Sequence, residues 1–409
     1  MKRVLLSAYA CSPIRGSEPG NGWSWAMNLA KKGYEVWCIT NTEDRQQTID
    51  ECERLNLTNL HLVFVEIPHN LDVKLLNPSS KTIYLHYLLW RRSAKKIAKK
   101  LHDDKNFDVA HHATYGSLQQ GSILWGLKNV KIIFGPVGGG QTALPKFKSY
   151  FGNAWKVEII RNIVSKLFLT FGKDVRKTLK ESNHILAANT DTVNMIKRAG
   201  YYNEDKVHLT LDSAVPPIME NNIYHEKENK EVLNLLWVGR MLPRKGLNLI
   251  LHALSKLPAD FDYKFTIVGG GELFHLLDGW IEKYKLNKSK FRILGQIPFA
   301  EVLDSYKAAD IFVFCSLRDS CGSQLIEAMS FGLPVVALDI HGSSIAVLND
   351  CGIKVKATNP EETTEGIAAA ILKMSTDYEF RKSCSKNAFD HAKNNTWEKK
   401  VDYITSKFY

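Results

Sequence analysis

Two acidic residues, Asp319 and Glu327, lie eight positions apart in the stretch RDSCGSQLIEAM, residues 318–329. The pattern predicts a helix that begins near Ser323, directly after a glycine turn. A helix N-terminus presents backbone N–H groups and a positive dipole end, so it favours anions. Asp319 alone fits a helix cap, but Glu327 lies about one turn inside the helix. We therefore expect the N–H groups to bind a phosphate and the carboxylates to accept hydrogen bonds from sugar hydroxyls.

A second stretch, GRMLPRKG at residues 239–246, follows a predicted buried strand. Arg240 and Lys245 come after the strand end, and the final glycine opens the next helix. Two cations beside helix N–H groups make a site for a diphosphate, although a solvated basic loop has the same composition. Glycines also follow two further strands, at IVGGGE (267–272) and FRILGQI (291–297), so the pattern recurs along the second half.

The first half has a glycine-containing stretch of its own, GSEPGNGWSWA at residues 16–26. Gly20 and Gly22 match the first two glycines of a dinucleotide-binding fingerprint, but Trp25 occupies the third position. The second predicted strand ends at Asn41 and not at the carboxylate that would bind a ribose. The pattern argues against NAD and leaves two interpretations, a loop that approaches a ligand and a plain tight turn.

The adjacent histidines His111 and His112 end the fourth predicted strand. Adjacent residues on a strand point to opposite faces, so at most one of the two side chains faces a ligand. A structural role for both is the alternative. The stretch GPVGGG, residues 135–140, follows the fifth predicted strand at the same edge, where it either cradles a donor or acceptor or simply connects two elements.

These loops require parallel strands to position them, and the sequence predicts two series of strands separated by helices. The first series is VLLSAY, EVWCIT, LHLVFV, DVAHH and VKIIF, with helices over 22–33 and 43–56. The second series is LNLLWVG, KFTIVG, FRILG, IFVFC and PVVAL, with helices over 246–257, 272–285, 299–308 and 323–331. This alternation predicts an α/β protein with two doubly wound, Rossmann-like sheets, which bind ligands beyond the carboxyl ends of their strands.

The length of 409 residues suits two domains. The polar stretch 215–231 contains a proline pair and predicts the linker between them. We expect one domain over 1–213, a second over 214–393 and a terminal helix over 394–409. The short apolar run near the N-terminus predicts a first buried strand and not a signal sequence.

The composition, 44% hydrophobic and 24% charged, is typical of a globular protein. No apolar run approaches the roughly 20 residues that span a bilayer. The seven cysteines include no CxxC pair, which argues against a disulfide framework or a zinc site and favours the reducing cytoplasm.

The net positive charge lies entirely in the first half. Residues 1–213 carry 30 Lys and Arg against 19 Asp and Glu, whereas residues 214–409 carry 24 of each. Two segments, 81–105 and 145–180, combine basic with aromatic and aliphatic side chains. This combination predicts contact with an anionic membrane surface, with a soluble basic domain as the alternative. No nucleic-acid reader module is recognisable, so we expect no nucleic-acid partner.

Together, GRMLPRKG, IVGGGE and the block from Asp319 to GLPVVA resemble the family 4 glycosyltransferases, and the resemblance extends over essentially the full chain. It implies the GT-B fold, in which two Rossmann-like domains face a central cleft, and retention of configuration at the anomeric carbon. It also implies that the first domain binds the acceptor, that the second binds a nucleotide sugar, and that the helix over 394–409 crosses back onto the first domain.

The resemblance assigns a role to each marked residue. Arg240 and Lys245 would bind the donor diphosphate and stabilise it as the leaving group. Glu327 would hold the ribose hydroxyls, and Asp319 would contact hydroxyls of the donor sugar. Further contacts with the nucleotide sugar would come from Gly20, Gly22, Gly239, Gly269, Gly271, Gly295, Gln296, Ile297, Cys321, Gly322, Ser323, Gln324 and Leu325.

One of His111 and His112 would face the donor sugar. The triplet Asp260-Phe261-Asp262 spells the DxD metal signature of the other major glycosyltransferase fold. It lies just before a predicted strand, so we interpret it as a surface turn and expect no metal site.

The chain departs from the family pattern on the sugar side of the site. The first acid is Asp319 where the family usually has Glu, and Ser320 and Cys321 replace a common glycine–aromatic pair. The stretch DIHGSSIA lacks the common glycine pair and the later Glu. These departures leave the fold prediction unchanged and bear on the identity of the sugar.

The predicted function is a retaining, metal-independent hexosyl- or N-acetylhexosaminyl-transferase that uses a nucleotide sugar as substrate, with UDP favoured, and needs no cofactor. The acceptor would be a hydroxyl of a glycan or lipid-linked acceptor in cell-surface polysaccharide synthesis. We expect the protein in the cytoplasm, with its basic half at the inner face of the cytoplasmic membrane. A sugar phosphorylase, a nucleotide-sugar epimerase and a non-enzymatic binder of the same fold are the alternatives.

Overall fold

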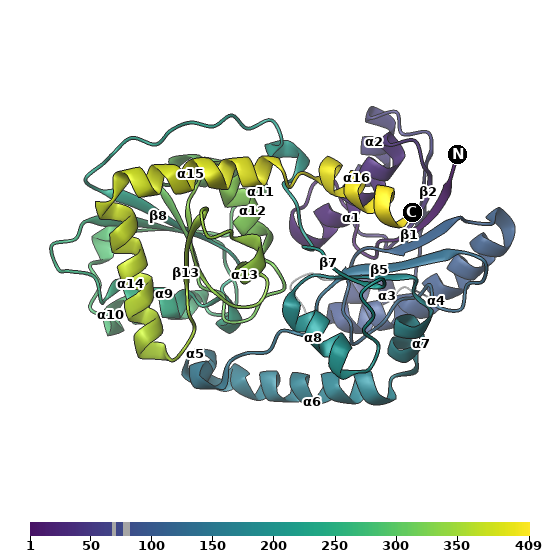
Figure 1. The fold of residues 1–409 in the computed structure, drawn as a ribbon, viewed down its shortest axis with the longest axis horizontal. Coiled ribbons are helices and arrows are strands. Elements are labelled where there is room, and N and C mark those ends of the chain that lie inside the picture. Colours follow the sequence, from purple (N-terminus) through teal and green to yellow (C-terminus); the bar gives the residue numbers. More distant parts are fainter. Residues whose placement is uncertain (68–70, 77–81) are drawn as a thin grey trace. The chain divides into compact units, whose positions relative to one another are not determined.

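The protein's structure, a computed structural model, describes residues 1–67, 71–76 and 82–409 and divides into two compact units. Unit 1 comprises Met1–Gly140, Val164–Asp212 and Trp397–Tyr409, and unit 2 comprises Gln141–Ile163 and Ser213–Thr396. Each unit contains one parallel β-sheet with helices on its two faces (Figure 1).

The sheet of unit 1 has seven strands in the order β3-β2-β1-β4-β5-β6-β7, all paired in parallel. The chain order reverses between β1 and β4, which makes this the switch point of a doubly wound sheet. The strands are β1 (Arg3–Ser7), β2 (Glu35–Thr40), β3 (Leu60–Phe64), β4 (Val109–His112), β5 (Lys131–Val137), β6 (His184–Ala187) and β7 (Val207–Leu209). The helices of this unit are α1 (Ser17–Lys31), α2 (Arg45–Arg54), α3 (Leu71–Leu75), α4 (Thr82–Lys105), α7 (Lys173–Glu181), α8 (Thr190–Arg198) and α16 (Trp397–Phe408).

The sheet of unit 2 has six parallel strands in the order β10-β9-β8-β11-β12-β13, and its switch point lies between β8 and β11. The strands are β8 (Leu233–Val238), β9 (Tyr263–Val268), β10 (Phe291–Gly295), β11 (Ile311–Phe314), β12 (Val335–Leu338) and β13 (Gly352–Val355). The α-helices are α5 (Lys148–Phe151), α9 (Leu247–Leu254), α10 (Leu277–Lys283), α11 (Phe299–Ala308), α12 (Ser323–Met329), α13 (Ser343–Ala346), α14 (Pro360–Thr376) and α15 (Tyr378–Lys393). The 3₁₀ helices are η1 (Pro145–Phe147), η2 (Gly152–Ala154), η3 (Pro217–Met219), η4 (Pro243–Lys245), η5 (Phe274–Leu276) and η6 (Lys288–Lys290).

Continuous apolar runs form the central strands because helices cover both faces of each sheet. Every residue of β11 and β12 is buried, as are all but the first residues of β1 and β2. The prediction of two doubly wound sheets is therefore confirmed. The short strands β6, β7 and β13 were not predicted, because they have only three or four residues and include polar or partly exposed positions.

The segment 141–163 differs from the predicted domain boundaries. The sequence places it with the first domain, but its contacts lie with unit 2. Phe147 and Phe151 are buried in the core of unit 2, and the Tyr150 hydroxyl lies 2.8 Å from Nδ1 of His252. The long helix α6 (Trp155–Phe171) then carries the chain back into unit 1, so the division between units falls within this helix.

The other division follows the predicted positions more closely. The chain passes from unit 1 to unit 2 between Asp212 and Ser213 and returns after Thr396. The returning helix α16 packs on α1, where the Trp25 and Trp397 rings are 5.7 Å apart. Burial of two indole rings is a large apolar contribution, which explains why the terminal helix lies against the first sheet's helices.

Candidate functional site

Two loops meet at the carboxyl edge of the sheet in unit 2. Strand β8 continues into residues 239–246 and its neighbour β11 into residues 315–322. The carbonyl oxygen of Arg244 accepts hydrogen bonds from the Leu317 N–H at 2.8 Å and the Ser316 hydroxyl at 2.9 Å. The switch point of the sheet thus joins the cationic loop and the acidic loop that the sequence singles out.

A charged cluster forms where these loops meet. Oδ2 of Asp319 accepts a hydrogen bond from the Lys245 ammonium group, and Nη1 of Arg244 lies 3.4 Å from the same oxygen. The hydroxyl of Ser316 lies 3.4 Å from that oxygen as well. Lys245 and Asp319 were predicted to share one site, and they lie in direct contact.

The electrostatics of the cluster favour charged groups. Burial alone would raise the pKa of the Asp319 carboxyl, but the positive charges of Lys245 and Arg244 outweigh it and hold that pKa well below its usual range. Burial lowers the pKa of Lys245, and the negative charge of Asp319 opposes this shift. The attraction within the pair therefore keeps an ammonium group in a buried position.

Two glycines permit the loops to approach each other. Gly246 has a φ of +69°, and a Cβ atom there would lie 1.9 Å from the carbonyl oxygen of Cys315. Gly322 has a φ of +89°, and its Cβ would lie 2.5 Å from the ring of Phe314. A side chain at position 246 would push the cationic loop away from the acidic loop, and one at position 322 would push the acidic loop off the ring of Phe314 at the end of β11.

Glu327, the second acid, lies one turn inside α12, as predicted. Its side chain is buried, and Oε2 accepts a hydrogen bond of 2.8 Å from the Tyr306 hydroxyl on α11. Burial raises the pKa of Glu327, while the hydrogen bonds from Tyr306 and Ser323 oppose that shift. No local pattern in the sequence identifies Tyr306, because the contact depends on the packing of α11 beside α12.

The predicted phosphate cradle, residues 321–325, covers the end of the loop and the start of α12. Cys321 and Leu325 are buried, whereas Gly322, Ser323 and Gln324 are partly exposed. The Leu325 N–H donates to the Gly322 carbonyl at 3.0 Å, so this N–H group is already in a hydrogen bond. The remaining members of the cradle stay predictions of backbone contact.

The loops after β8, β9 and β10 lie against one another along the same edge. The Gly269 N–H donates to the Gly295 carbonyl at 2.6 Å, and the Gly239 N–H donates to Val268 at 3.0 Å. A Cβ at Gly269 would lie 1.9 Å from the Gly239 carbonyl oxygen, so only glycine fits there. Three further predicted residues follow these strands, namely Gly271, Gln296 and Ile297.

The second cation next to Asp319 is Arg244, a residue that the sequence did not single out. Arg240 is exposed, and none of the ion pairs among the described residues involves it. Arg244 reaches Asp319 instead, at 3.4 Å. It directly precedes Lys245 in the sequence, and this proximity was the one signal that could have identified it.

A buried ion pair connects Arg318 of the acidic loop to Glu158 on α6. Nη2 of Arg318 donates to Glu158 at 2.9 Å, and Nε lies 2.8 Å from the other carboxylate oxygen. Arg161 also contacts Glu158, at 3.3 Å, and donates to the carbonyl oxygen of Gln141 at 2.8 Å. This network was not predicted, because Glu158 and Arg318 are far apart in the chain.

The predicted histidines in unit 1 lie on opposite faces of β4. Nε2 of His111 lies 2.6 Å from the Gly135 carbonyl oxygen, so it carries the proton and donates, while Nδ1 accepts from the Tyr409 hydroxyl at 2.6 Å. The His111 ring also packs edge-on against Trp25. Burial lowers its pKa to about 4, so this side chain is a neutral, fully bonded residue near neutral pH.

His112 packs against Phe134 and is fully buried. Neither ring nitrogen makes a hydrogen bond of good geometry within the described part of the chain, although the Tyr115 backbone lies close enough to oppose the pKa shift weakly. Burial, together with the charge of Arg91, lowers the pKa of His112 to about 3. The two histidines do point in different directions, as the strand geometry predicted.

The glycines Gly20 and Gly22 lie in the first two turns of α1, which begins at Ser17 and not at residue 22, so Gly20 lies in the helix and not in the loop before it. A Cβ at Gly22 would lie 2.0 Å from the Ala10 carbonyl oxygen, and one at Gly20 would lie 2.4 Å from that of Arg15. Close packing of the helix on the chain after β1 therefore accounts for both glycines. Their predicted contact with a ligand remains a prediction.

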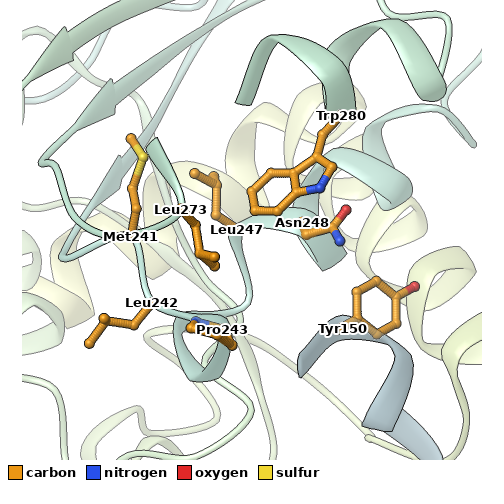
Figure 2. A pocket seen from close by; sticks show the side chains of 8 residues that line it. All are labelled: Tyr150, Met241, Leu242, Pro243, Leu247, Asn248, Leu273 and Trp280. Atoms are coloured by element: carbon orange, nitrogen blue, oxygen red, sulfur yellow. The ribbon is translucent and has the colours of Figure 1, made fainter. Parts of the chain in front are cut away.

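The triplet at residues 260–262 lies in the turn before β9, as predicted, with both acids exposed, and Asp262 pairs with Lys290 at 3.3 Å. No cluster of three or more His, Cys, Asp or Glu side chains suited to a metal ion occurs among the described residues. A hollow beside the 239–246 loop is lined by uncharged residues, among them Tyr150, Met241 and Trp280 (Figure 2). With no cation in its lining, this hollow does not suit a diphosphate.

Comparison with known proteins bears on the segment that contains the charged cluster. The profile of the family described as glycosyl transferases group 1 matches residues 219–391. These residues are a glycosyl transferases group 1 domain. The resemblance inferred from the strand-end motifs is thereby confirmed at the level of the group 1 glycosyltransferases, and Lys245, Asp319 and Glu327 all lie inside the group 1 domain.

Two curated relatives align with this chain. An uncharacterized glycosyltransferase of Methanocaldococcus jannaschii is 25% identical over 55% of the chain and 65% of its own length. The O-antigen chain mannosyltransferase B of Escherichia coli is 29% identical over 40% of the chain and 42% of its own length. The chain therefore spans less than two thirds of the length of either relative.

The fold matches a solved structure over almost the whole chain. HepE of Anabaena, crystallised with UDP and glucose, has a TM-score of 0.61 at 15% identity, with 99% of each chain covered. The architecture around the group 1 domain is thus GT-B, two Rossmann-like units of parallel strands and helices. None of the helices in the described ranges is long and apolar enough to cross a membrane.

Proposed function

We propose that the protein is a glycosyltransferase that moves a sugar from a nucleotide-sugar donor to a hydroxyl group. The observation that carries this proposal is the cluster of Lys245, Arg244 and Asp319 at the switch point of the group 1 domain. Doubly wound sheets bind ligands at this position, and cations there favour a diphosphate.

The donor diphosphate would replace Asp319 as the partner of the two cations. A diphosphate presents several charged oxygens, and guanidinium and ammonium groups bind such oxygens through charge-assisted hydrogen bonds. Arg240 is exposed at the same strand end and would add a third positive charge. Asp319, released from its cations, would then accept hydrogen bonds from hydroxyls of the donor sugar.

In the reaction, the bond between the anomeric carbon and the diphosphate oxygen breaks and a bond to the acceptor oxygen forms. Negative charge develops on the departing diphosphate, and Lys245 and Arg244 would stabilise it. The acceptor hydroxyl proton would pass to the departing phosphate oxygen. This front-face route retains the configuration at the anomeric carbon and requires no metal ion, because protein cations meet the charge.

The nucleoside would lie along the loops after β9 and β10. Phe274 has a half-exposed ring next to Gly295, and aromatic rings stack on bases. Glu327 would hold the ribose hydroxyls, since a carboxylate accepts two hydrogen bonds at once. UDP is the favoured nucleotide, with support from the UDP bound to HepE of Anabaena.

The acceptor would be a glycan or a lipid-linked hydroxyl, and the transferred group a hexose or an N-acetylhexosamine. Support for a role in cell-surface polysaccharide synthesis comes from the aligned O-antigen mannosyltransferase of Escherichia coli. The cytoplasm is the proposed location, since nucleotide sugars are the proposed donors.

The test is calorimetric titration with UDP, GDP, ADP and inorganic phosphate, followed by slow hydrolysis of matching nucleotide sugars in EDTA. We expect binding of UDP and metal-free release of sugar, both abolished or strongly reduced in Glu327→Ala. Glu301→Ala is the matched control, because Glu301 lies exposed in the first turn of α11. Binding of phosphate without any nucleotide would contradict the proposal and favour a phosphorylase.

A further inference from the structure

Helix α6 presents its polar side inward. Glu158 and Ser165 are buried, and Arg161 and Asn162 are half-buried on the same side of the helix. An ordinary surface helix buries its apolar side and exposes its polar side. The orientation of α6 is therefore the reverse of that expected for a helix whose outer side faces only water.

The helix α6 is 17 residues long (Figure 1), and its outer side carries exposed apolar side chains from Val157 to Phe171. Phe171 is 75% exposed, Val157 63% and Ile160 60%. At 100° per residue, most of these side chains project within an arc of about 100°. The exposed apolar residues are Val157, Ile159, Ile160, Ile163, Val164, Leu167, Phe168 and Phe171. A continuous apolar surface of this kind marks a contact with a membrane or a protein.

The orientation of α6 is fixed by its inner contacts. Glu158 lies 2.8 Å from Arg318 and 3.3 Å from Arg161, so both ion-pair partners of its carboxylate belong to unit 2. Trp155 packs on the core of unit 2 and Leu169 on a core cluster of unit 1. Rotation of the helix to bury its apolar side would expose or break this ion network, which is costly for buried charges.

The charges around the outer side are positive. Lys156 and Lys166 are exposed on α6, and Lys173 and Arg176 follow at the start of α7. Residues 155–176 contain two acids, Glu158 on the inner side of α6 and Asp174, which lies 3.2 Å from Arg91. Basic residues whose stems lie along an apolar helix surface are typical of helices that rest on anionic lipid.

We propose that the outer side of α6 binds the surface of an anionic lipid bilayer. The helix would lie in the plane of the interface, with its apolar side chains at the boundary of headgroups and acyl chains and its lysines at the phosphates. A second copy of the chain fits less well, because paired α6 helices would bring the like charges of Lys156 and Lys166 together.

This assignment narrows the membrane prediction made from the sequence. Of the two segments, the first forms α4 over residues 82–105, its residue 81 being outside the described part of the chain, and its aromatic residues Tyr87 and Trp90 are buried in the core of unit 1. Three apolar side chains of α4 are exposed, namely Tyr84, Leu85 and Leu88. The inference therefore rests on α6 and not on α4.

The test measures flotation of the full chain with vesicles of phosphatidylcholine alone or with about one third phosphatidylglycerol. The variant Ile160→Ser/Phe168→Ser/Phe171→Ser removes apolar surface from the outer side of α6. We expect wild type to bind the anionic vesicles and the triple variant to lose about tenfold or more in affinity. The matched control is Ile218→Ser/Ile223→Ser/Leu348→Ser, three exposed apolar residues elsewhere that should leave binding unchanged.

Two results would overturn the inference. One is the absence of wild-type binding to anionic vesicles at low salt, and the other is equal loss of binding in the α6 and control variants. Light scattering adds a separate check, since a dimer that dissociates in the α6 variant, without vesicle binding, would assign this surface to a second copy. Vesicle binding needs no sugar donor, so failure here would leave the proposed function standing.

Discussion

The two sheets share the order of their first six strands, but the side chains at their carboxyl edges are charged in one unit and neutral in the other. In unit 2 the switch point gathers Lys245, Arg244 and Asp319, all in their charged forms. In unit 1 the corresponding edge ends β4 with His111 and His112, which burial holds neutral. The same strand order thus produces a charged edge in one unit and an uncharged edge in the other.

The acid nearest the uncharged edge follows the same trend. Glu18, in the first turn of α1, accepts a hydrogen bond from the Tyr115 N–H at 3.1 Å. Burial is the main cause that raises the pKa of Glu18 to about 7, and the negative charge of Asp212 is the second cause. Topology therefore decides where a ligand can approach, while the side chains at that edge decide which ligand binds. A diphosphate suits the charged edge, and hydroxyl groups suit the neutral edge.

The largest expected effect comes from removal of the buried cation. Lys245→Met removes the ammonium group that would stabilise the leaving diphosphate, so turnover should fall by about 10²- to 10³-fold. Lys290→Met is the matched control, because Lys290 pairs with Asp262 at 3.3 Å in the same unit. Initial rates with the best donor, together with thermal unfolding of both variants, provide the measurement. Equal activity in the two variants would mean that the charged edge does not perform the chemistry.

A second variant tests whether Asp319 competes with the donor. Asp319→Asn removes the negative charge that occupies Lys245 and Arg244, so these cations become available to a diphosphate. We expect UDP to bind up to about tenfold more tightly, equivalent to about 1.4 kcal/mol, while turnover falls. Calorimetry and initial rates measure the two effects separately. Weaker UDP binding in the variant would indicate that Asp319 positions the cations and does not compete with the donor.

The charged edge was largely predictable because its signals are local. A buried strand followed by glycines and cations identifies 239–246, and an acid before a helix start identifies Asp319. Gly246 and Gly322 are required by close approach of backbone or ring atoms, and their neighbours in sequence already suggested a turn. The two doubly wound sheets followed from the same periodic pattern.

The remaining features depend on contacts between residues far apart in the sequence. Tyr306 reaches Glu327 only when α11 and α12 are packed, and Glu158 reaches Arg318 across 160 positions. The predicted helix begins at residue 22, yet α1 begins at Ser17, so Gly20 lies inside the helix that packs on Ala10 through Gly22. Periodicity cannot predict such pairs, because it reports which side of an element is apolar and not which partner that side meets.

A smaller effect is expected at the carboxylate that would bind the ribose. Tyr306→Phe removes the 2.8 Å hydrogen bond to Glu327, which opposes the rise in pKa caused by burial. The pKa of Glu327 should therefore rise further, and donor binding should weaken by about fivefold. As the pH falls, the carboxylate should become protonated, and donor binding should be lost, at a higher pH than in wild type. The pH profile of kcat/KM measures the shift. Tyr284→Phe, which loses a 2.9 Å bond to Asn248, is the control and should leave the profile unchanged.

The last prediction concerns the uncharged edge, where we expect no loss of activity at pH 7 and only a change in stability with pH. Burial lowers the pKa of His112 to about 3 in the folded chain, against about 6.5 in unfolded chains. Between these values the unfolded state binds more protons, so the free energy of unfolding decreases as the pH falls from 6.5 toward 3. His112→Leu removes this contribution, while His111 and Glu18 act equally in both proteins. The variant should match wild type within about 1 kcal/mol at pH 7 and exceed it by about 2 kcal/mol at pH 5. Denaturant unfolding at the two pH values measures the difference.

An equal loss of stability on acidification in both proteins would show that His112 is not held neutral. Loss of activity at pH 7 in a stable variant would place the His112 ring against the donor sugar.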